Sequence, residues 1–449
     1  MIKTSAIFLF LNYCLGKKVD MSMVVAKIDW RQLYTFASRQ ALLGFCFDGI
    51  ERLTKEFSEE LKQNPMGRDL LMTWMGAAQQ IRRQNMKVNV VASKLFSMLR
   101  EDGMRCCILK GQGNALMYPN AYSRNPGDID VWVNASREQI TEYAKKHFEL
   151  GDDIRYHHLE TSLDGVPMEL HFFPGIMNNP IYNARLQKWF KRNADLQCSH
   201  IVGLPDGAGD IAIPTTAFNV VYQLTHLYHH FFDEGIGMRQ IIDYFLVVCD
   251  FYKVYQKSSN PSVSLSKGSS TFSPSPSSSG SGDVTAPSRC SEPLRSKVGG
   301  PSKVSPNCAG WDRRGVSGDT SSVSCSSASG SSASTALVVV QRELKYLGLW
   351  KFARAVMYVL HEALGLPEEK MIAPMDEKRG KLLLAEILNG GNFGKHFTKY
   401  GHFIQQGMAK KYFLKIWRNM HFVRYYPAEA LSEPIFRTWH FFWRMKNKR

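Results

Sequence analysis

Apolar positions in the N-terminal part of the chain recur at helical spacing. Residues 29–62 carry apolar side chains three, four and seven positions apart. Residues 83–100 repeat this pattern with Val88, Val91, Leu95 and Leu99. One face of each segment can therefore be buried while the other stays solvated. We expect residues 24–100 to form helices.

After residue 100 the pattern changes to short apolar or alternating runs, which predict β-strands. "RCCIL" (105–109) and "DIDVWV" (128–133) have the composition of buried strands. Residues 154–173 hold two alternating runs joined by Asp164-Gly165, a dipeptide that tolerates positive φ and favours a tight hairpin. In the second run the apolar side chains take one face, so Glu169 lies on the other.

Helical spacing returns in residues 215–256 and again from residue 337 to the end. Between them, residues 257–336 contain 28 serines in 80 positions and almost no large apolar side chains. Such a segment cannot bury enough surface to offset its ordering entropy, so we predict a disordered serine-rich insertion. The expected fold is α+β, with a small mixed β-sheet in residues 101–214 flanked by N-terminal helices and a C-terminal basic helical region, residues 337–449.

The first 23 residues contain a lysine followed by a short apolar run. The run resembles a weak signal sequence, but it lacks a clear small-x-small cleavage site and is short for a bilayer span. We favour translation from Met21 or Met23, which makes residues 1–23 an extension. The nine cysteines show no paired CxxC array and no zinc-ligand spacing, which favours a reducing compartment and a cytoplasmic location.

The net charge of +16 is concentrated at one end, because residues 395–449 hold 12 Lys and Arg against 2 Glu. Aromatic side chains alternate with these basic ones. Such a segment could stack on nucleic acid or rest on an anionic membrane. A helical subdomain with aromatics in its core and lysines in water explains the pattern at least as well.

Asp128 and Asp130 are the strongest sign of chemistry. Two positions apart in an apolar strand, their carboxylates are expected on one face, where they repel each other unless a cation lies between them. Mg²⁺ prefers oxygen ligands and keeps positions free for phosphate, with Mn²⁺ as an alternative; two such ions can hold the attacking and leaving oxygens. Glu169 is the candidate third ligand and could help to deprotonate an acceptor. The alternative is a solvated strand face or a loop edge for the two aspartates, and an edge strand that faces water for Glu169.

The turn at Gly111 opens a short helix whose free backbone N–H groups are suited to a triphosphate. Lys110 and Arg124 could add charge-assisted contacts to the phosphates, although a solvated strand end and a local ion pair explain them equally well. Arg239 and Asp243, four positions apart on a helix, are explained by a plain salt bridge. A packed helix face accounts for His226, His229 and His230.

The order of these elements resembles the DNA polymerase beta-like nucleotidyltransferase superfamily. The strings "ILKGQGNALMYPNAYSRNPGDIDVWV" and "GIGMRQIIDYF" are similar to a largely uncharacterised bacterial family within it, over most of residues 24–256 and 337–365. The resemblance implies transfer of a nucleoside monophosphate from an NTP to an unknown acceptor, with release of pyrophosphate.

By the same resemblance Asp128, Asp130 and Glu169 would be the metal carboxylates, and Gly111 the glycine of the phosphate turn. The sequence departs from the superfamily at Gln112, where Ser or Gly usually follows that glycine. Two other functions stay open: a nucleotide-binding but inactive relative, and a nucleic-acid or membrane-binding protein that acts through its basic aromatic C-terminus.

Overall fold

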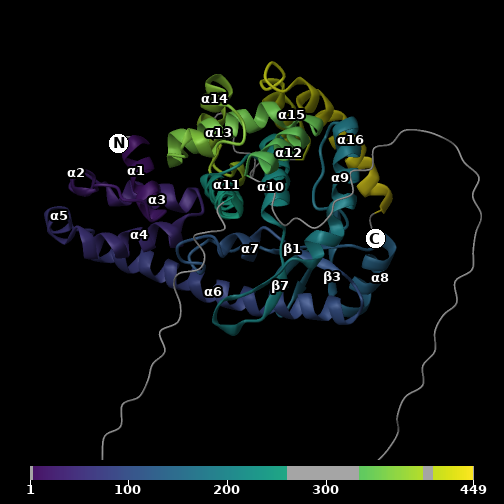
Figure 1. Cartoon of the computed structure of the whole chain (residues 1–449), viewed down its shortest axis with the longest axis horizontal. Helices are drawn as coiled ribbons and strands as arrows, with labels where there is room; N and C mark the ends of the chain where they lie inside the picture. Colours follow the sequence, from purple (N-terminus) through teal and green to yellow (C-terminus); the bar gives the residue numbers. More distant parts are fainter. Residues whose placement is uncertain (1–3, 260–332, 398–407, 448–449) are drawn as a thin grey trace, which may run out of the picture. The chain divides into compact units, whose positions relative to one another are not determined.

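The computed structural model describes residues 4–259, 333–397 and 408–447 (Figure 1). The helices of the first range are α1 (Thr4–Cys14), α2 (Ser22–Val25), α3 (Trp30–Arg39), α4 (Leu43–Glu56), α5 (Ser58–Gln63), α6 (Arg68–Glu101), α7 (Gly111–Ala115), α8 (Arg137–His147), α9 (Pro180–Ser199), α10 (Thr216–Asp233) and α11 (Met238–Ser259). The later helices are α12 (Ala333–Tyr346), α13 (Trp350–Leu364), α14 (Glu377–Gly390), α15 (Met408–Met420) and α16 (Pro427–Asn447).

The strands are β1 (Cys106–Leu109), β2 (Ile129–Val133), β3 (Glu149–Ile154), β4 (His158–Leu163), β5 (Val166–His171), β6 (Ile201–Gly203) and β7 (Asp210–Ala212). Short 3₁₀ helices are η1 (Pro205–Gly207), η3 (Glu368–Lys370) and η4 (Asn392–Gly394). β1 to β5 form one sheet in the order β1-β2-β5-β4-β3, and β6 pairs with β7. Only β2 and β5 run parallel, so the sheet is mixed and the α+β prediction is confirmed.

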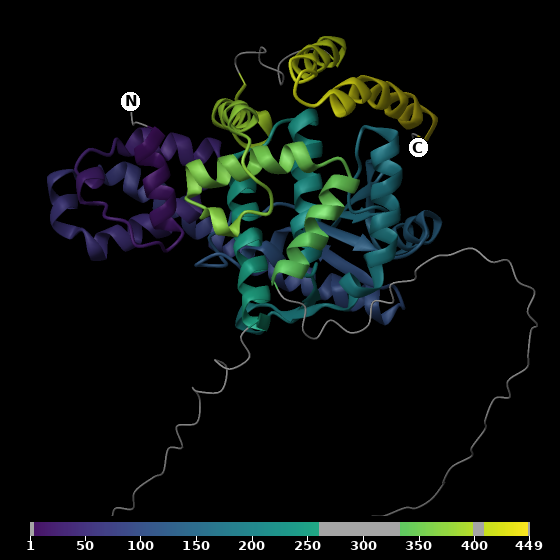
Figure 2. The same cartoon turned by 45° about the horizontal axis from the view of Figure 1, so that its top comes forward.

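The five-stranded sheet separates two apolar clusters. The face that carries Ile129, Val131 and Val133 packs on apolar side chains of α6 and α8. The opposite face carries Cys107, Leu109 and Trp132, which pack with residues of α9 and α10. Figure 1 shows α6 and α8 on one side of the sheet and α10 on the other. Polar residues on the second face are therefore held between the sheet and a helical layer (Figure 2).

Local signals explain several element boundaries. Ser136 and Gln139 form a reciprocal capping box at the start of α8, as their spacing predicts. Leu163 pairs with Val166 across the β4–β5 hairpin, whose two central residues, Asp164 and Gly165, have φ values of 51° and 71°. Positive φ at both positions is what a type I′ turn requires. The sequence did not predict β3, β6, β7 or α9.

The segment predicted as an extension or weak signal-like stretch, residues 1–23, contributes to the core. Phe10, Leu11 and Tyr13 of α1 are buried, with at most 1% of each side chain exposed. α1 packs on α4 and α13, which lie far apart in the sequence. Within the described ranges, each helix is too short or too polar to cross a membrane.

The predicted serine-rich insertion, residues 257–336, lies largely outside the described residues. At its edges the prediction needs correction, because α11 continues to Ser259 and α12 begins at Ala333. α12 packs on α10 and α11, so the chain returns to the same helical layer after the insertion.

Candidate active site

Two of the predicted carboxylates are neighbours on adjacent strands. Asp130 of β2 pairs in register with Glu169 of the parallel strand β5. Paired residues of neighbouring strands point to the same face. Asp130 and Glu169 therefore share the face opposite Ile129 and Met168, both of which belong to the cluster under α6. The strand order brings together two acidic side chains that the sequence separates by a helix and two strands.

Asp130 is held between two cationic groups. Its side chain is 10% exposed, with Oδ2 3.0 Å from Lys110 Nζ and Oδ1 3.0 Å from His171 Nε2. Burial opposes ionisation of this carboxyl, but Lys110 and His171 outweigh it and hold its pKa well below the ordinary value. Asp130 is therefore a carboxylate at neutral pH.

His171 bridges the two acids. Its Nε2 lies 3.0 Å from Asp130 Oδ1 and 3.1 Å from Glu169 Oε2. Burial lowers the pKa of the imidazole, but its hydrogen bonds to the two carboxylates have the larger effect and raise that pKa to about 9. For Glu169, burial favours the neutral acid, yet the hydrogen bond from His171 lowers its pKa. The three groups form a charged cluster, in which His171 is cationic at neutral pH.

Asp128 differs from the other two acids. It directly precedes β2, which begins at Ile129, so the expectation that both aspartates belong to the strand is wrong at this position. Its side chain is exposed at the mouth of the cleft. Desolvation by the surrounding protein, with repulsion from Asp130 and Glu169, raises its pKa to about 7. Asp128 thus gains a proton readily unless a cation lies beside it.

A cleft opens beside this cluster. It encloses about 530 Å³, counting space open to solvent, and its lining includes Lys110, Gly111, Arg124, Asp128 and Asp130. A second recess of about 900 Å³, counted in the same way, shares Asp128 and has Glu149, Glu160 and Glu169 in its wall. Five of the predicted site residues therefore face one cleft, and Asp128 lies between the two recesses.

The turn after β1 brings Lys110 into the cleft. Lys110 adopts φ 51° and ψ −122°, and Gly111 follows with φ 32°. A non-glycine residue in this region costs about 1–3 kcal/mol, which the surrounding structure must offset. Lys110 Nζ reaches both Asp130 and, at 3.2 Å, His226 Nε2 of α10. Burial and the charge of Lys110 hold the pKa of His226 well below its usual value, so this imidazole is neutral.

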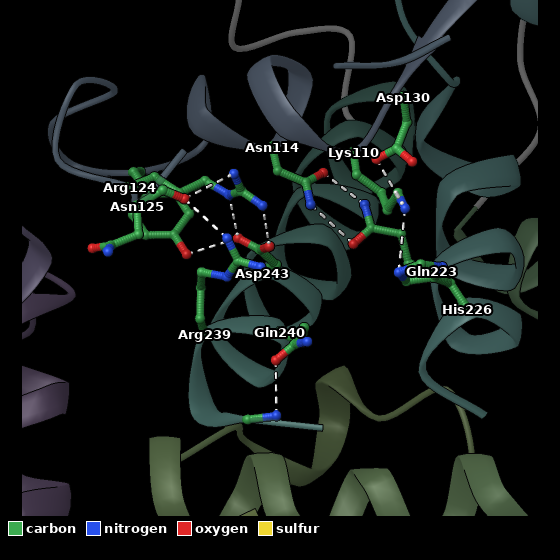
Figure 3. Close-up of polar contacts among 12 residues, drawn as sticks. Lys110, Asn114, Arg124, Asn125, Asp130, Gln223, His226, Arg239, Gln240 and Asp243 are labelled. Atoms are coloured by element: carbon green, nitrogen blue, oxygen red, sulfur yellow. Dashed lines mark hydrogen bonds and ion pairs between the residues drawn. The ribbon is translucent and has the colours of Figure 1, made fainter. Parts of the chain in front are cut away.

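Arg124 makes a buried ion pair instead of the local one that its sequence suggests. It donates from Nε to Asp243 Oδ1 at 2.9 Å and from Nη2 to Asp243 Oδ2 at 2.8 Å (Figure 3). Asp243 also accepts from Tyr118 Oη at 2.7 Å. The expected Arg239–Asp243 salt bridge is therefore wrong: Arg239 donates to the carbonyl of Asn125 at 3.0 Å.

A comparison with protein-family models matches residues 26–254, just over half of the chain, to a family described as "Uncharacterised nucleotidyltransferase". The chain belongs to this nucleotidyltransferase family. Among solved structures it is similar to an antigenic nucleotidyltransferase-like protein from Paracoccidioides brasiliensis, with 16% identity, 36% of this chain and 75% of that chain covered, and a TM-score of 0.25. A comparison with curated proteins gives no match.

The acidic cluster of this nucleotidyltransferase fits a divalent cation. Asp130, Glu169 and His171 each offer a ligand atom, and these atoms lie within 4.8 Å of one another. Carboxylate oxygens suit Mg²⁺ and Mn²⁺, and imidazole suits the transition metals. In the protein described here Lys110 and His171 balance the two negative charges, so a bound cation would replace part of their role.

Sequence reasoning missed several cleft residues of the nucleotidyltransferase. His226 belongs to a helix face interpreted as packed, yet it lines the cleft together with Gln223 and Arg239. Gln223 exchanges two hydrogen bonds with Asn114 of α7, at 3.0 and 2.6 Å, which fixes that short helix on α10. A polar residue every three or four positions along an otherwise apolar helix is the signal that could have identified this face.

Proposed function

We propose that the chain is a metal-dependent nucleotidyltransferase that moves a nucleoside monophosphate from an NTP to an unknown acceptor. The observation that supports this most is the in-register pairing of Asp130 with Glu169, with Asp128 at the mouth of the same cleft. The polymerase beta-like relationship, the bacterial family and the cytoplasmic location are part of the same proposal.

Each side chain has a role in this proposal. Asp128, Asp130 and Glu169 hold Mg²⁺, most simply two ions with Mn²⁺ as an alternative, and bound metal would neutralise charge on the reacting phosphates. Lys110 and the turn at Gly111 bind the phosphates of the NTP from the basic side of the cleft. Glu169, ionised at neutral pH, accepts the proton of the acceptor.

Arg124 has a different role from the direct phosphate contact expected of it. Its side chain is 6% exposed, and Nε and Nη2 both donate to Asp243, so a phosphate would have to displace a buried carboxylate. We therefore propose that Arg124 positions the cleft wall next to Asp128. Arg239, with Nε buried and unpartnered among the described residues, is the better candidate for a phosphate contact.

The acceptor would enter through the second recess, which meets the first at Asp128. Its wall carries Glu149, Glu160 and Glu169. Acidic walls favour a neutral or cationic acceptor over a phosphorylated one, because like charges at short range repel.

The test is transfer of label from each α-³²P NTP in the presence of Mg²⁺ or Mn²⁺, with a cell extract as the source of acceptor. Asp130→Asn should reduce transfer at least about 10²-fold, since it removes charge stabilisation that catalysis needs. Asp195→Asn is the matched control, because the Asp195 carboxylate is exposed and, among the described residues, pairs with Arg105 and Asn134 outside the cleft. Equal transfer by Asp130→Asn and the parent would refute the proposed site.

One observation favours the inactive, nucleotide-binding alternative. Lys110 and His171 both lie 3.0 Å from Asp130 and neutralise it without metal. A relative in which these two side chains take the place of the cations would bind a triphosphate without transferring it. If triphosphate binds with the same affinity in EDTA and in Mg²⁺, and Asp128→Asn leaves the biological activity intact, this alternative is correct.

A second observation favours binding through the C-terminal segment, residues 395–449. Phe413, Trp417 and Phe442 are 69%, 50% and 62% exposed. The same helices also have a buried face, where Arg418 donates to the carbonyl of Phe231 at 2.9 Å. Binding to single-stranded nucleic acid or anionic vesicles should therefore be tested with surface substitutions and not by deletion, which would uncover α10.

A further inference from the structure

Two buried histidines face each other beside the acidic pair. His158 of β4 and His171 of β5 are register partners in the antiparallel hairpin, and each is 3% exposed. Their ring centroids are 5.1 Å apart. Because register partners share a face, both imidazoles lie on the face that carries Asp130 and Glu169. Four potential metal ligands therefore converge from three neighbouring strands.

Three contacts among these ligand atoms have the length expected of neighbouring ligands on one ion. His171 Nε2 is 3.0 Å from Asp130 Oδ1 and 3.1 Å from Glu169 Oε2. His158 Nδ1 is 3.1 Å from the same Glu169 oxygen. Ligands at about 2.1 Å from one ion and at right angles to each other are about 3.0 Å apart, so these three contacts suit neighbouring ligands. The ligand atoms within 4.8 Å of one another are those of Asp130, Glu169 and His171, so His158 has to move towards the ion to join them.

The ring nitrogens of His158 are buried and lack hydrogen-bond partners among the described residues. The approach to Glu169 lacks hydrogen-bond geometry. A buried polar group without a partner is unfavourable by about 1–3 kcal/mol. Coordination of an ion by Nδ1 would satisfy this nitrogen.

We propose that His158 and His171 coordinate a divalent transition-metal ion together with Asp130 and Glu169. The inference rests on the proposed metal role of the two carboxylates and goes beyond it, because imidazole ligands favour Mn²⁺ or Zn²⁺ over Mg²⁺. Coordination requires Nε2 of His171 to release its proton to solvent, so the incoming cation replaces a positive charge already present between the acids.

The experiment uses Mn²⁺ alone with the full chain in the absence of nucleotide. Pulsed EPR detects the ¹⁴N nuclei of imidazoles bound directly to Mn²⁺. The parent protein should show this nitrogen coupling, His158→Gln and His171→Gln should each weaken it, and the double variant should lose it. Each single variant should also bind Mn²⁺ at least about 10-fold more weakly. His147→Gln, at an exposed histidine on α8, is the matched control.

Mn²⁺ bound without nitrogen coupling in the parent protein would overturn the inference, as would failure to bind Mn²⁺. The first result would leave an oxygen-only metal site, and with it the proposed transfer reaction, intact. NTP transfer measured on the same preparation in Mg²⁺ separates the two failures. Circular dichroism checks that the variants fold. If a variant does not fold, the presence or absence of nitrogen coupling in the parent protein decides whether the inference holds.

Discussion

Replacing Asp128 by Asn should stabilise the metal-free protein while it removes a proposed metal ligand. The pKa of Asp128 in the folded chain is about 7, whereas a free Asp titrates near 3.8. The folded state therefore retains a proton that the unfolded state has lost. Stability falls as the pH rises through this window, and above it the full cost of desolvating the carboxylate, together with its repulsion from Asp130 and Glu169, remains.

The size of the effect follows from the same pKa difference. A pKa difference of one unit corresponds to about 1.4 kcal/mol, so the pKa difference of Asp128 corresponds to a change in the free energy of unfolding of about 4 kcal/mol at most. The side chain is exposed, and solvent screening reduces the contribution to about 1–2 kcal/mol. Asn keeps the shape without the charge, so the variant should gain this amount at pH 8 and almost nothing at pH 4.

The assay is urea unfolding in EDTA at several pH values between 4 and 8. Asp195→Asn, at an exposed acid outside the cluster, should change stability by less than about 0.5 kcal/mol at every pH. Adding Mn²⁺ at pH 8 should stabilise the parent protein more than the Asp128→Asn variant. If the Asp128→Asn variant is only as stable as the parent protein at pH 8, or less stable, the reasoning that desolvation and the neighbouring acids make an ionised Asp128 unfavourable is refuted.

Other outcomes follow from the same contacts. His171→Gln should destabilise the metal-free protein by about 1–3 kcal/mol. Because the pKa of His171 is raised to about 9, the destabilisation should have its full size below about pH 6.5 and decrease as the pH passes 9. Urea unfolding at pH 6 and pH 9.5 checks this. Asp243→Asn should cost about 3–5 kcal/mol, since it leaves Arg124 charged and buried, and a thermal midpoint unchanged from the parent would contradict this. Trp417→Ser should leave stability within about 0.5 kcal/mol while it weakens any retention on anionic vesicles, and full retention would argue against membrane contact through this face.

Much of the secondary structure was predictable because its signals are local. The hairpin at Asp164-Gly165, the capping box at Ser136 and the strand that contains Asp130 depend on residues only a few positions apart. Periodicity reports which residues share a face, and this also identified Glu169 as a polar side chain opposite an apolar strand face. The same reasoning could not locate the edge of β2, which excludes Asp128.

The sequence by itself determined the residue types of the candidate site and, for Asp130 and Glu169, the strand face that each occupies. The tertiary structure decided which of them meet: Asp130 beside Glu169 through a parallel pairing, Arg124 with Asp243 across 119 positions, and Lys110 with His226 across 116. Local patterns carry no information on strand order or on which helix covers which face. Those contacts depend on how the whole chain buries its two apolar clusters around one sheet.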